Sequence, residues 1–337
     1  MQTNTPKKKR GGRRARGKSP RGGQPIFAAI DLGTNNCRLL IAKAASGGSF
    51  RVIDSFSRIV RLGEGLSETG RLSPTAIART VAALKVCAEH LSSKRVTHLR
   101  AIATEACRQA ENASELVERV REETGIELDI VTADEEARLA ALGCAPLIGR
   151  RYDGALVFDI GGGSTELIWT RKRDGAAETL ASVSLDAGVV TLSERLGAER
   201  SLADYLAAVK PLFTKARREI EKTLPLDIPA HHLLGTSGTV TTLAGIALGL
   251  PRYERARVDA SWHLCDDILA VVERLSGMDR TARTAQPCIG EERADLVLPG
   301  CAIFSAIHAE WPCAELRVAD RGLRDGMLRE LMAEAQN

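Results

Sequence analysis

The sequence has few aromatic side chains, no long apolar run and no clustered cysteines. Only 4% of its 337 residues are Phe, Trp or Tyr, which leaves few side chains that could stack on a planar ligand. It contains no stretch of about 18 uninterrupted apolar residues, and its N-terminus lacks the apolar segment of a signal peptide. These absences argue against a membrane-spanning or secreted protein, so we expect a cytoplasmic location.

The eight cysteines are scattered, with no Cys-x-x-Cys pair and no His/Cys cluster at zinc-binding spacing. Most of them lie inside apolar segments, where a reduced cysteine packs as a small hydrophobic side chain. We therefore expect reduced, buried thiols and no structural zinc.

Positive charge is concentrated at the N-terminus. The net charge is +4, but residues 1–24 contain nine Lys or Arg residues and no Asp or Glu, so the rest of the chain is acidic. A tail of this composition buries too little apolar surface to offset its ordering entropy, and we expect it to be disordered. It would attract a polyanion such as RNA, DNA or a phosphate polymer. A solvated extension of minor function is an equally good interpretation.

The two halves of the sequence repeat one pattern. Residues 26–31 (IFAAID) form an apolar run, followed by the small turn LGTNN and a second apolar run. Residues 154–169 repeat it as GALVFD, IGGGS and TELIW, so that Asp31 aligns with Asp159 and Gly33 with Gly161. The two aspartates are 128 residues apart, which is the length of a domain. We infer a structural duplication.

Strand-like and helix-like segments alternate through both halves. Helices are predicted from a Ser-Pro start at residue 73 to about 90, over 112–124, from Asp134, over 188–196, 202–222, 264–275, 291–309 and 322–334. Strands between them, including IELDIV at 126–131, indicate mixed α/β sheets covered by helices. The predicted organisation is a basic tail (1–24), two α/β domains (25–138 and 139–320) and a C-terminal helix (321–337) that packs back on the first domain.

The turn in FDIGGGSTEL, residues 158–167, has the composition of a phosphate site. Three glycines let backbone amides converge on phosphate oxygens, and Ser164 and Thr165 add hydroxyl donors. Asp159 and Glu166 lie on the two strands that flank the turn, and paired carboxylates suit a hard cation such as Mg²⁺.

The first turn has matching chemistry. Asp31 is followed by Gly33, Thr34, Asn35 and Asn36, and Arg38 on the returning strand could bind a phosphate through two hydrogen bonds. A third glycine- and threonine-rich turn, GTSGTVTTLAG, occupies 235–245. Two facing phosphate loops on duplicated domains predict a cleft for a metal-bound phosphate, with Asp31, Asp159 and Glu166 as candidate metal ligands.

Hydrolysis of a phosphate also needs a positioned water molecule. Glu135 and Glu136 begin the helix that precedes the second loop, where a carboxylate could orient or deprotonate water. Acidic residues in the first turn of a helix also simply favour its dipole, and the sequence leaves both interpretations open.

Eight segments, taken in order, resemble the exopolyphosphatase and guanosine pentaphosphate phosphohydrolase (Ppx/GppA) family. They are AIDLGTNNCRLLI, IATEACRQAENA, DEEARL, FDIGGGSTEL, SLDAGVVTL, GTSGTVTTLAG, GEERADLVLPG and DRGLRDGML. The resemblance covers about residues 26–330 and implies duplicated actin-like (ribonuclease H-like) domains with the active site between them. It also implies removal of terminal phosphates from polyphosphate or pppGpp with Mg²⁺ or Mn²⁺.

The resemblance also implies roles for individual residues. Asp159 and Glu166 would hold the metal, and Glu135, the first acidic residue of the family's E-E-A-R segment, would be the general base, although Glu136 stays an alternative. Arg38, Arg108 and Arg293 would bind the anionic chain. The candidate phosphate-binding residues are then Gly33, Thr34, Asn35, Asn36, Arg38, Arg108, Gly161, Gly162, Gly163, Ser164, Thr165, Gly235, Thr236, Ser237, Gly238 and Arg293.

The chain departs from the family pattern in two ways. Many members have Val-His-Gly where this chain has Val258, Asp259 and Ala260, which leaves the effect of Asp259 open. We expect a short two-domain form without the C-terminal helical domains of larger members, and a homodimer.

The expected activity is removal of terminal orthophosphate from polyphosphate. Hydrolysis of pppGpp to ppGpp in the stringent response is the alternative, and the low aromatic content slightly favours polyphosphate. An actin-like ATPase or kinase and an RNA-associated binding protein are further alternatives, although no sugar-pocket or chaperone segment is evident.

Overall fold

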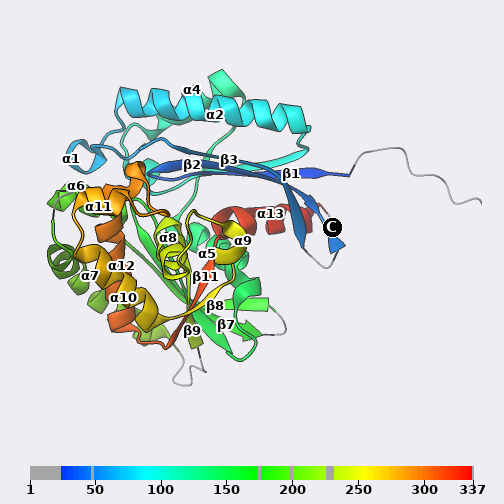
Figure 1. Ribbon diagram of the computed structural model, residues 1–337. Coiled ribbons are helices and arrows are strands. Elements are labelled where there is room, and N and C mark those ends of the chain that lie inside the picture. Colours follow the sequence, from blue (N-terminus) through cyan, green and yellow to red (C-terminus); the bar gives the residue numbers. More distant parts are fainter. Residues whose placement is uncertain (1–23, 47–48, 174–175, 198–199, 225–230, 336–337) are drawn as a thin grey trace, which may run out of the picture.

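The computed structural model describes residues 24–335 apart from 47–48, 174–175, 198–199 and 225–230. Two mixed β-sheets, each flanked by helices, make up this part of the chain (Figure 1). No helix in it is both long and apolar enough to cross a membrane. Residues 1–23 of the basic tail lie outside the described residues, so the expectations for the tail stay predictions.

The first sheet has the strand order β3-β2-β1-β4-β5. Its strands are β1 (Ile26–Leu32), β2 (Asn36–Ala44), β3 (Phe50–Ile59), β4 (His98–Ala103) and β5 (Asp129–Ile130). β1 and β3 are antiparallel to β2, whereas β4 is parallel to both β1 and β5. Of the strand expected over 126–131, only Asp129 and Ile130 are paired with another strand. They form β5, an edge strand with β4 as its one neighbour.

Alternating side chains of β1 bury both faces of this sheet. Ala28 and Ile30 pack in a cluster with α2 (Pro74–Lys94) and α4 (Ala113–Thr124). Phe27 and Ala29 instead pack with α13 (Leu323–Glu334). Figure 1 shows α2 and α4 above the sheet and α13 below it.

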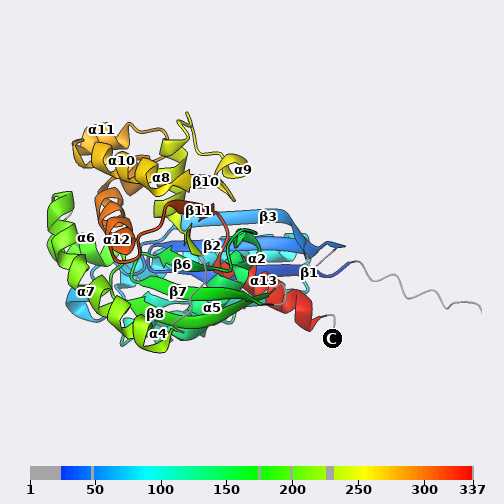
Figure 2. The same cartoon turned by 90° about the horizontal axis from the view of Figure 1, so that it is seen from below.

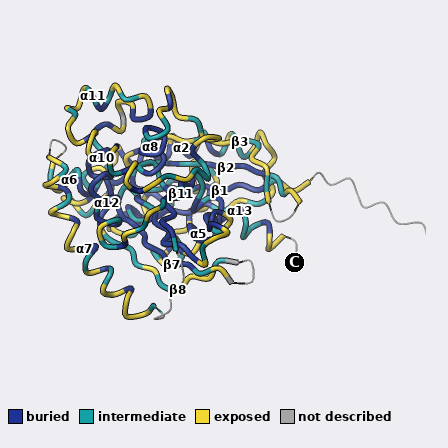
Figure 3. Tube along the Cα trace, turned by 60° about the horizontal axis from the view of Figure 1, so that its bottom comes forward, coloured by how far each residue is buried: buried dark blue, intermediate teal, exposed yellow. Residues whose placement is uncertain are grey.

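The second sheet has the order β10-β11-β9-β6-β7-β8. Its strands are β6 (Gly154–Ile160), β7 (Thr165–Arg173), β8 (Ala176–Leu185), β9 (His231–Thr236), β10 (Trp262–Leu264) and β11 (Glu315–Ala319). Leu156 and Phe158 face the cluster of α7 (Leu202–Thr223) and α12 (Val297–Glu310), whereas Ala155 and Val157 face α5 (Ala133–Cys144). In Figure 3 buried residues concentrate in the interior, and exposed residues lie on the outer surfaces of the peripheral helices and loops.

The predicted duplicated actin-like α/β fold is confirmed. The order β3-β2-β1-β4-β5 is repeated as β8-β7-β6-β9-β11, with β10 added antiparallel at the edge. Side-chain caps account for several helix starts. Ser73 accepts a hydrogen bond from the Ala76 amide at 3.1 Å, and Thr132 accepts one from the Glu135 amide at 3.2 Å. The segment expected to form one helix over 291–309 is a 3₁₀ helix, Glu291–Leu296, followed by α12.

Shorter helices complete the fold. They are α1 (Leu66–Thr69), α3 (Glu105–Gln109), α6 (Val189–Leu196), α8 (Gly238–Ala247), α9 (Arg255–Val258), α10 (Cys265–Ser276), α11 (Arg280–Thr284) and a 3₁₀ turn, Ala145–Leu147. All eight cysteines are free, and seven are buried.

Helices α5 and α13 connect the two sheets. They lie side by side in Figures 1 and 2, and Leu139 of α5 packs in one cluster with Leu323 and Met327 of α13. The C-terminal helix therefore rests against the first sheet, while α5 also covers the second. With the sheets held in this way, the carboxyl ends of β1 and β6 open into the same cavity.

Candidate active site

A cavity of about 580 Å³ lies between the two halves. The first half contributes the loop 33–36, and the second contributes the loop 160–164 and the β9–α8 turn. The chain from 320 to 324, which leads from β11 into α13, forms a further side. The sequence-based prediction of an interdomain cleft with both glycine loops in its wall therefore agrees with the geometry.

The two loops have the same internal geometry. The Gly33 amide donates to the Asn36 carbonyl at 2.9 Å, and the Gly161 amide donates to the Ser164 carbonyl at 2.9 Å. Both hydrogen bonds close a tight turn between antiparallel strands. The repeated pattern in the sequence thus corresponds to a repeated turn in space.

Neighbouring segments donate hydrogen bonds to the carbonyls of the two loops, and amides of the loops are left to bind a ligand. Residues 60–63 donate backbone hydrogen bonds to the carbonyls of Thr34 and Asn35, and residues 189–191 donate to those of Gly161 and Gly162. Within the described chain, the amides of Thr34, Asn35, Gly162 and Gly163 have no acceptor. Such converging amides form an anion-binding concavity.

The loops touch each other, which explains why Gly163 carries no side chain. A Cβ atom there would lie 2.6 Å from Oγ1 of Thr34 and 3.0 Å from Cγ of Glu105. Any larger residue would push the two loops apart. Gly162 and Gly163 therefore allow the close approach of the two halves, whereas a Cβ atom at Gly161 would lie 2.9 Å from the Ser164 carbonyl oxygen of its own turn.

The third turn brings the start of α8 to the cavity. Ser237 precedes this helix with φ 105°, outside the usual region for a residue with a side chain. Its hydroxyl is buried and has no hydrogen-bond partner among the described residues. The first amides of α8 also lack intrahelical acceptors, so the turn is a third set of donors for an anion.

Asp159 and Glu166 face each other across the second loop. They are directly opposite in the β6–β7 ladder, and Glu166 accepts hydrogen bonds from the hydroxyls of Ser164 at 2.6 Å and Ser184 at 3.1 Å. Burial raises the pKa of Asp159 to about 6, and burial with the nearby Asp159 charge raises the pKa of Glu166 to about 7.

The first loop has a guanidinium at the equivalent position. Asp31 lies directly opposite Arg38 in the β1–β2 ladder, as Asp159 lies opposite Glu166. Burial raises the pKa of Asp31, and the Arg38 charge opposes that shift. The duplication has thus produced an acidic loop on one side of the cavity and a loop of mixed charge on the other.

Glu136 is the acidic residue of α5 that lines the cavity. Oε2 of Glu136 accepts a hydrogen bond of 2.8 Å from Arg108. Burial and the nearby Glu166 charge raise the pKa of Glu136 well above its usual range, while Arg108 opposes the shift. A carboxylate in this environment can accept a proton from water near neutral pH.

The expectation that Glu135 faces the cleft is wrong. Its side chain pairs instead with Arg138 at 2.7 Å and Arg100 at 2.7 Å, which also bind Glu330 of α13. The hydrogen bond from Arg138 is the main cause that lowers the pKa of Glu135 to about 2. One helical position rotates a side chain by about 100°, so adjacent residues point to different surroundings. Of the two adjacent glutamates, the alternative candidate Glu136 is the one that lines the cavity.

Three further expected phosphate ligands do not line the cavity. The guanidinium of Arg108 donates hydrogen bonds to Glu136, to Glu105 and to the Val131 carbonyl. The hydroxyl of Thr165 donates to the Ala187 carbonyl at 2.6 Å. Gly235 is required by packing, because a Cβ atom there would lie 2.5 Å from the ring of Phe158.

The other expected site residues do line the cavity. They are Asp31, Gly33, Thr34, Asn35, Asn36, Arg38, Asp159, Gly161, Gly162, Gly163, Ser164, Glu166, Thr236, Ser237, Gly238 and Arg293.

Several lining residues were not singled out from the sequence: Glu105, Tyr253, Arg255, Asp320, Arg321 and Arg324. A usable signal existed for two of them, because Asp320 and Arg321 directly follow the end of β11, just as the loop residue Gly33 follows the end of β1.

Asp259 lies where many family members have a histidine, and its carboxylate accepts hydrogen bonds from the turn after β11. Its Oδ1 accepts hydrogen bonds from Nε of Arg321 at 3.1 Å and from the Asp320 amide at 3.0 Å. Both partners line the cavity. Asp259 therefore fixes the turn after β11 and does not itself reach the cavity.

The carboxylates at the cavity suit a divalent cation whose other ligands are water molecules and phosphate oxygens. Within the described part of the chain, no group of three or more His, Cys, Asp or Glu residues could hold a metal by itself. Mg²⁺ typically takes one or two protein carboxylates and completes its octahedron with water and phosphate oxygens. Asp159 is half-buried and Glu166 is buried, and neither has a cationic partner at hydrogen-bonding distance, so the pair has that chemistry.

Comparison with known proteins gives consistent matches over nearly the whole chain. The model of the Ppx/GppA phosphatase family matches residues 40–335. Exopolyphosphatase 2 from Mycobacterium tuberculosis is 33% identical over 317 residues, which are 90% of this chain and 98% of that protein.

Solved structures agree with these matches. The crystal structure of the Aquifex aeolicus member of the Ppx/GppA family has a TM-score of 0.77 at 28% identity and covers 93% of this chain and 99% of its own. An exopolyphosphatase from Cytophaga hutchinsonii shares the fold, with a TM-score of 0.81 at 23% identity and coverage of 92% and 98%. The expectation of a phosphoanhydride hydrolase is confirmed, and the chain belongs to the Ppx/GppA phosphatase family.

Proposed function

We propose that the protein is a Mg²⁺-dependent exopolyphosphatase that releases terminal orthophosphate from inorganic polyphosphate in the cavity between its halves. The observation that carries the proposal is the position of Glu136, which lines the same cavity as the two amide-rich loops and the Asp159–Glu166 pair. The name of the M. tuberculosis relative points to the same substrate class.

The loops would bind the terminal phosphates. Amides of Thr34, Asn35, Gly162 and Gly163 are available to phosphate oxygens, and Ser237 adds a buried hydroxyl. Asp159 and Glu166 would hold Mg²⁺ (or Mn²⁺), with Asp31 as a third candidate. When bound, the cation neutralises charge that develops on the phosphate oxygens.

Glu136 would act on the attacking water. A water molecule held by its carboxylate attacks the terminal phosphorus, and its proton passes to the carboxylate. The bond from that phosphorus to the bridging oxygen breaks, and the shortened chain leaves with the bonding electron pair. Arg108 keeps the carboxylate in place through the 2.8 Å hydrogen bond.

Phosphate release from purified protein tests the proposal. With Mg²⁺, the wild type and Glu135→Gln should release phosphate from medium-chain polyphosphate, whereas Glu136→Gln should lose 10²-fold or more in kcat. Chelation of the metal should abolish release, and added Mg²⁺ should restore it. Loss of activity in Glu135→Gln with retention in Glu136→Gln would reverse the assignment, and ATP hydrolysis without polyphosphate hydrolysis would reject the function.

Hydrolysis of pppGpp is a second candidate, supported by one observation. Tyr253 lines the cavity and is 40% exposed, so its ring is accessible to a nucleobase. If pppGpp is the better substrate, Tyr253→Ala should raise the KM for pppGpp and leave that for polyphosphate unchanged. Equal effects on both substrates would argue against stacking.

We further propose that the basic tail is an accessory contact for a polyanion, either polyphosphate or RNA, and that the protein is a homodimer. The tail proposal is supported by its nine Lys or Arg residues without an acidic residue. Deletion of residues 1–24 should weaken polyphosphate binding, most strongly at low salt, without lowering kcat. Unchanged binding would reject it, and sedimentation analysis decides the oligomeric state.

A further inference from the structure

One part of the cavity wall carries guanidinium and hydroxyl groups on strands other than those of the Asp159–Glu166 pair. In the first sheet, Arg38 lies opposite Asp31 on one side and opposite Ser57 on the other. Ser57 and Ser55 of β3 are exposed and line the cavity. Neighbouring strands are about 4.8 Å apart, so this row extends roughly 10 Å from Asp31 to Ser57 across the first sheet.

Arg324 approaches the same row from α13. Its Nη1 lies 3.5 Å from the carbonyl of Leu39, the residue that follows Arg38, and its side chain lines the cavity. Burial and the nearby Arg38 charge lower the pKa of Arg324, and both guanidinium charges oppose the rise that burial causes in the pKa of Asp31. Two guanidinium groups thus share one nearby carboxylate.

The other arginines on this side of the cavity already have acidic partners. Arg255 pairs with Asp320 at 3.3 Å, and Arg321 pairs with Asp259. In the described part of the chain, Arg38 has no ion pair within 4.0 Å and no side-chain hydrogen bond, and the Leu39 carbonyl is the hydrogen-bond acceptor of Arg324. Two half-buried guanidinium groups without full compensation favour an anionic ligand.

We propose that Arg38, Arg324 and Ser57 form a second anion subsite, which binds the phosphates behind the reacting one. Contact with Arg324 would make the affinity depend on the length of the phosphate chain. The inference rests on the proposed function, because it assigns a substrate segment to the same cavity. A phosphate chain can extend along the roughly 10 Å row from the loops to Arg324, whereas a single orthophosphate ion is too small to span it. Selectivity for longer chains should therefore appear in binding and KM.

Equilibrium binding without metal separates this subsite from the cation site. We would titrate tripolyphosphate and orthophosphate into the full-length protein in a chelator, using wild type, Arg324→Gln and Arg324→Lys. Arg324→Gln should weaken tripolyphosphate binding roughly tenfold or more, as expected for lost hydrogen bonds between charged groups. Orthophosphate binding should not change, and Arg324→Lys should recover part of the loss.

Arg329→Gln is the matched control, because Arg329 is on the same helix but stacks on Phe50 away from the cavity. Ser57→Ala is a second test at an exposed strand position, and it should lower the affinity for tripolyphosphate by a few fold. If Arg324→Gln does not fold, this variant tests the subsite alone. With Mg²⁺, Arg324→Gln should raise the KM for polyphosphate and leave kcat within a few fold.

Unchanged tripolyphosphate affinity in a folded Arg324→Gln, or in Ser57→Ala if that variant alone folds, would overturn the subsite. An equal loss for orthophosphate would also overturn it, because Arg324 would then serve the terminal phosphate. The proposed function fails separately: wild-type protein that binds tripolyphosphate through Arg324 but hydrolyses no polyphosphate would reject the activity and keep the subsite.

Discussion

Arg108 donates from Nη1 to Oε2 of Glu136 across 2.8 Å, and this contact fixes the carboxylate that we propose as the base. The same guanidinium donates from Nε to Glu105 at 2.9 Å and from Nη1 to the Val131 carbonyl at 3.0 Å. Arg108 of α3 thus connects Val131, the residue after β5, to α5. It is a positioning residue, because it acts on the site through Glu136.

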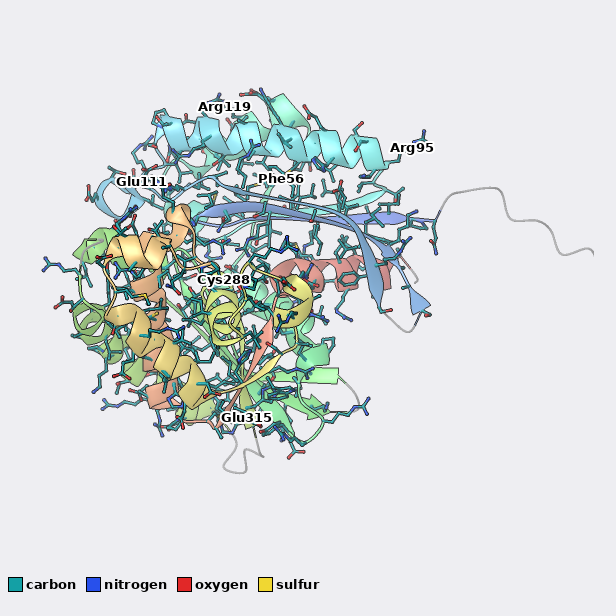
Figure 4. The ribbon with its side chains drawn as sticks, viewed as in Figure 1. Phe56, Arg95, Glu111, Arg119, Cys288 and Glu315 are labelled. Atoms are coloured by element: carbon teal, nitrogen blue, oxygen red, sulfur yellow. The ribbon has the colours of Figure 1, made fainter. Side chains whose placement is uncertain are left out.

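Replacement of Arg108 should lower turnover more than binding. We expect Arg108→Gln to reduce kcat by about tenfold or more, because a misplaced base loses alignment with water, while the KM for polyphosphate changes by less than threefold. Arg108→Lys should recover part of kcat. Arg119→Gln is the control, since Arg119 lies on the outer helix α4, far from the cavity (Figure 4). An increase in KM with unchanged kcat would instead make Arg108 a direct phosphate ligand.

The general fold could be read from the sequence because its signals are local. The apolar run ending in Asp31 and its repeat ending in Asp159 specified the two hairpins, and Ser73 lies at the helix start that the pattern indicated. The helix expected from Asp134 begins one residue earlier, after its cap Thr132. Strand ends place loop residues at one edge of a sheet, so the cleft followed from the duplication. β10 was missed because three residues are too few for a periodic signal.

The errors in the site come from side-chain direction and tertiary partners. Glu135 and Glu136 are adjacent and identical, and only the position of α5 decides which one enters the cavity. Gly235 looked like a phosphate-loop glycine, but the ring of Phe158 occupies the space beside it. Arg324 was missed because its approach to Arg38 depends on how α13 packs on the first sheet.

Glu135 should contribute to stability in a way that depends on pH. Its pKa of about 2 in the folded protein is below its usual value of 4.5, so its ion pairs stabilise the fold fully above about pH 4.5 and progressively less as the pH falls towards 2. With Glu135 27% exposed and Arg138 46% exposed, we expect Glu135→Gln to cost about 1 kcal/mol at pH 7. The wild-type advantage in denaturant unfolding should shrink between pH 4.5 and 3, and a constant difference would contradict this assignment.

Glu194 joins the two halves close to the loop residues Thr34 and Gly163. Its Oε1 accepts a hydrogen bond from the Gly65 amide at 3.1 Å, and its Oε2 accepts one from the Ser67 hydroxyl at 3.1 Å. Glu194 belongs to α6, which follows the second sheet, whereas Gly65 and Ser67 belong to the first half of the chain. The carboxylate therefore limits separation of the two loops.

Removal of this contact should loosen the cleft. Glu194→Ala should lower the free energy of unfolding by about 1 kcal/mol and raise the KM for polyphosphate several-fold, because closure must then come from substrate binding. Glu221→Ala removes an exposed carboxylate of α7, which is paired with Arg217, and should change neither quantity measurably. Identical behaviour of the two variants would mean that Glu194 does not hold the halves together.

Ala260 should be a position where glycine stabilises the protein. It has φ 68°, in the left-handed region, and its amide donates to the Val318 carbonyl at 2.8 Å, which fixes that conformation beside the Asp259 turn. The left-handed region costs a residue with a Cβ atom about 1–2 kcal/mol, and glycine avoids this cost. Glycine also makes the unfolded chain more flexible, which offsets about 0.4–1 kcal/mol of that gain in folding free energy. Ala260→Gly should therefore raise the free energy of unfolding by about 0.5 kcal/mol. Ala270→Gly, at an exposed position inside α10, should lower it by about 1 kcal/mol. Urea unfolding of both variants beside the wild type decides the point, since a loss at both positions would mean that Ala260 is not strained.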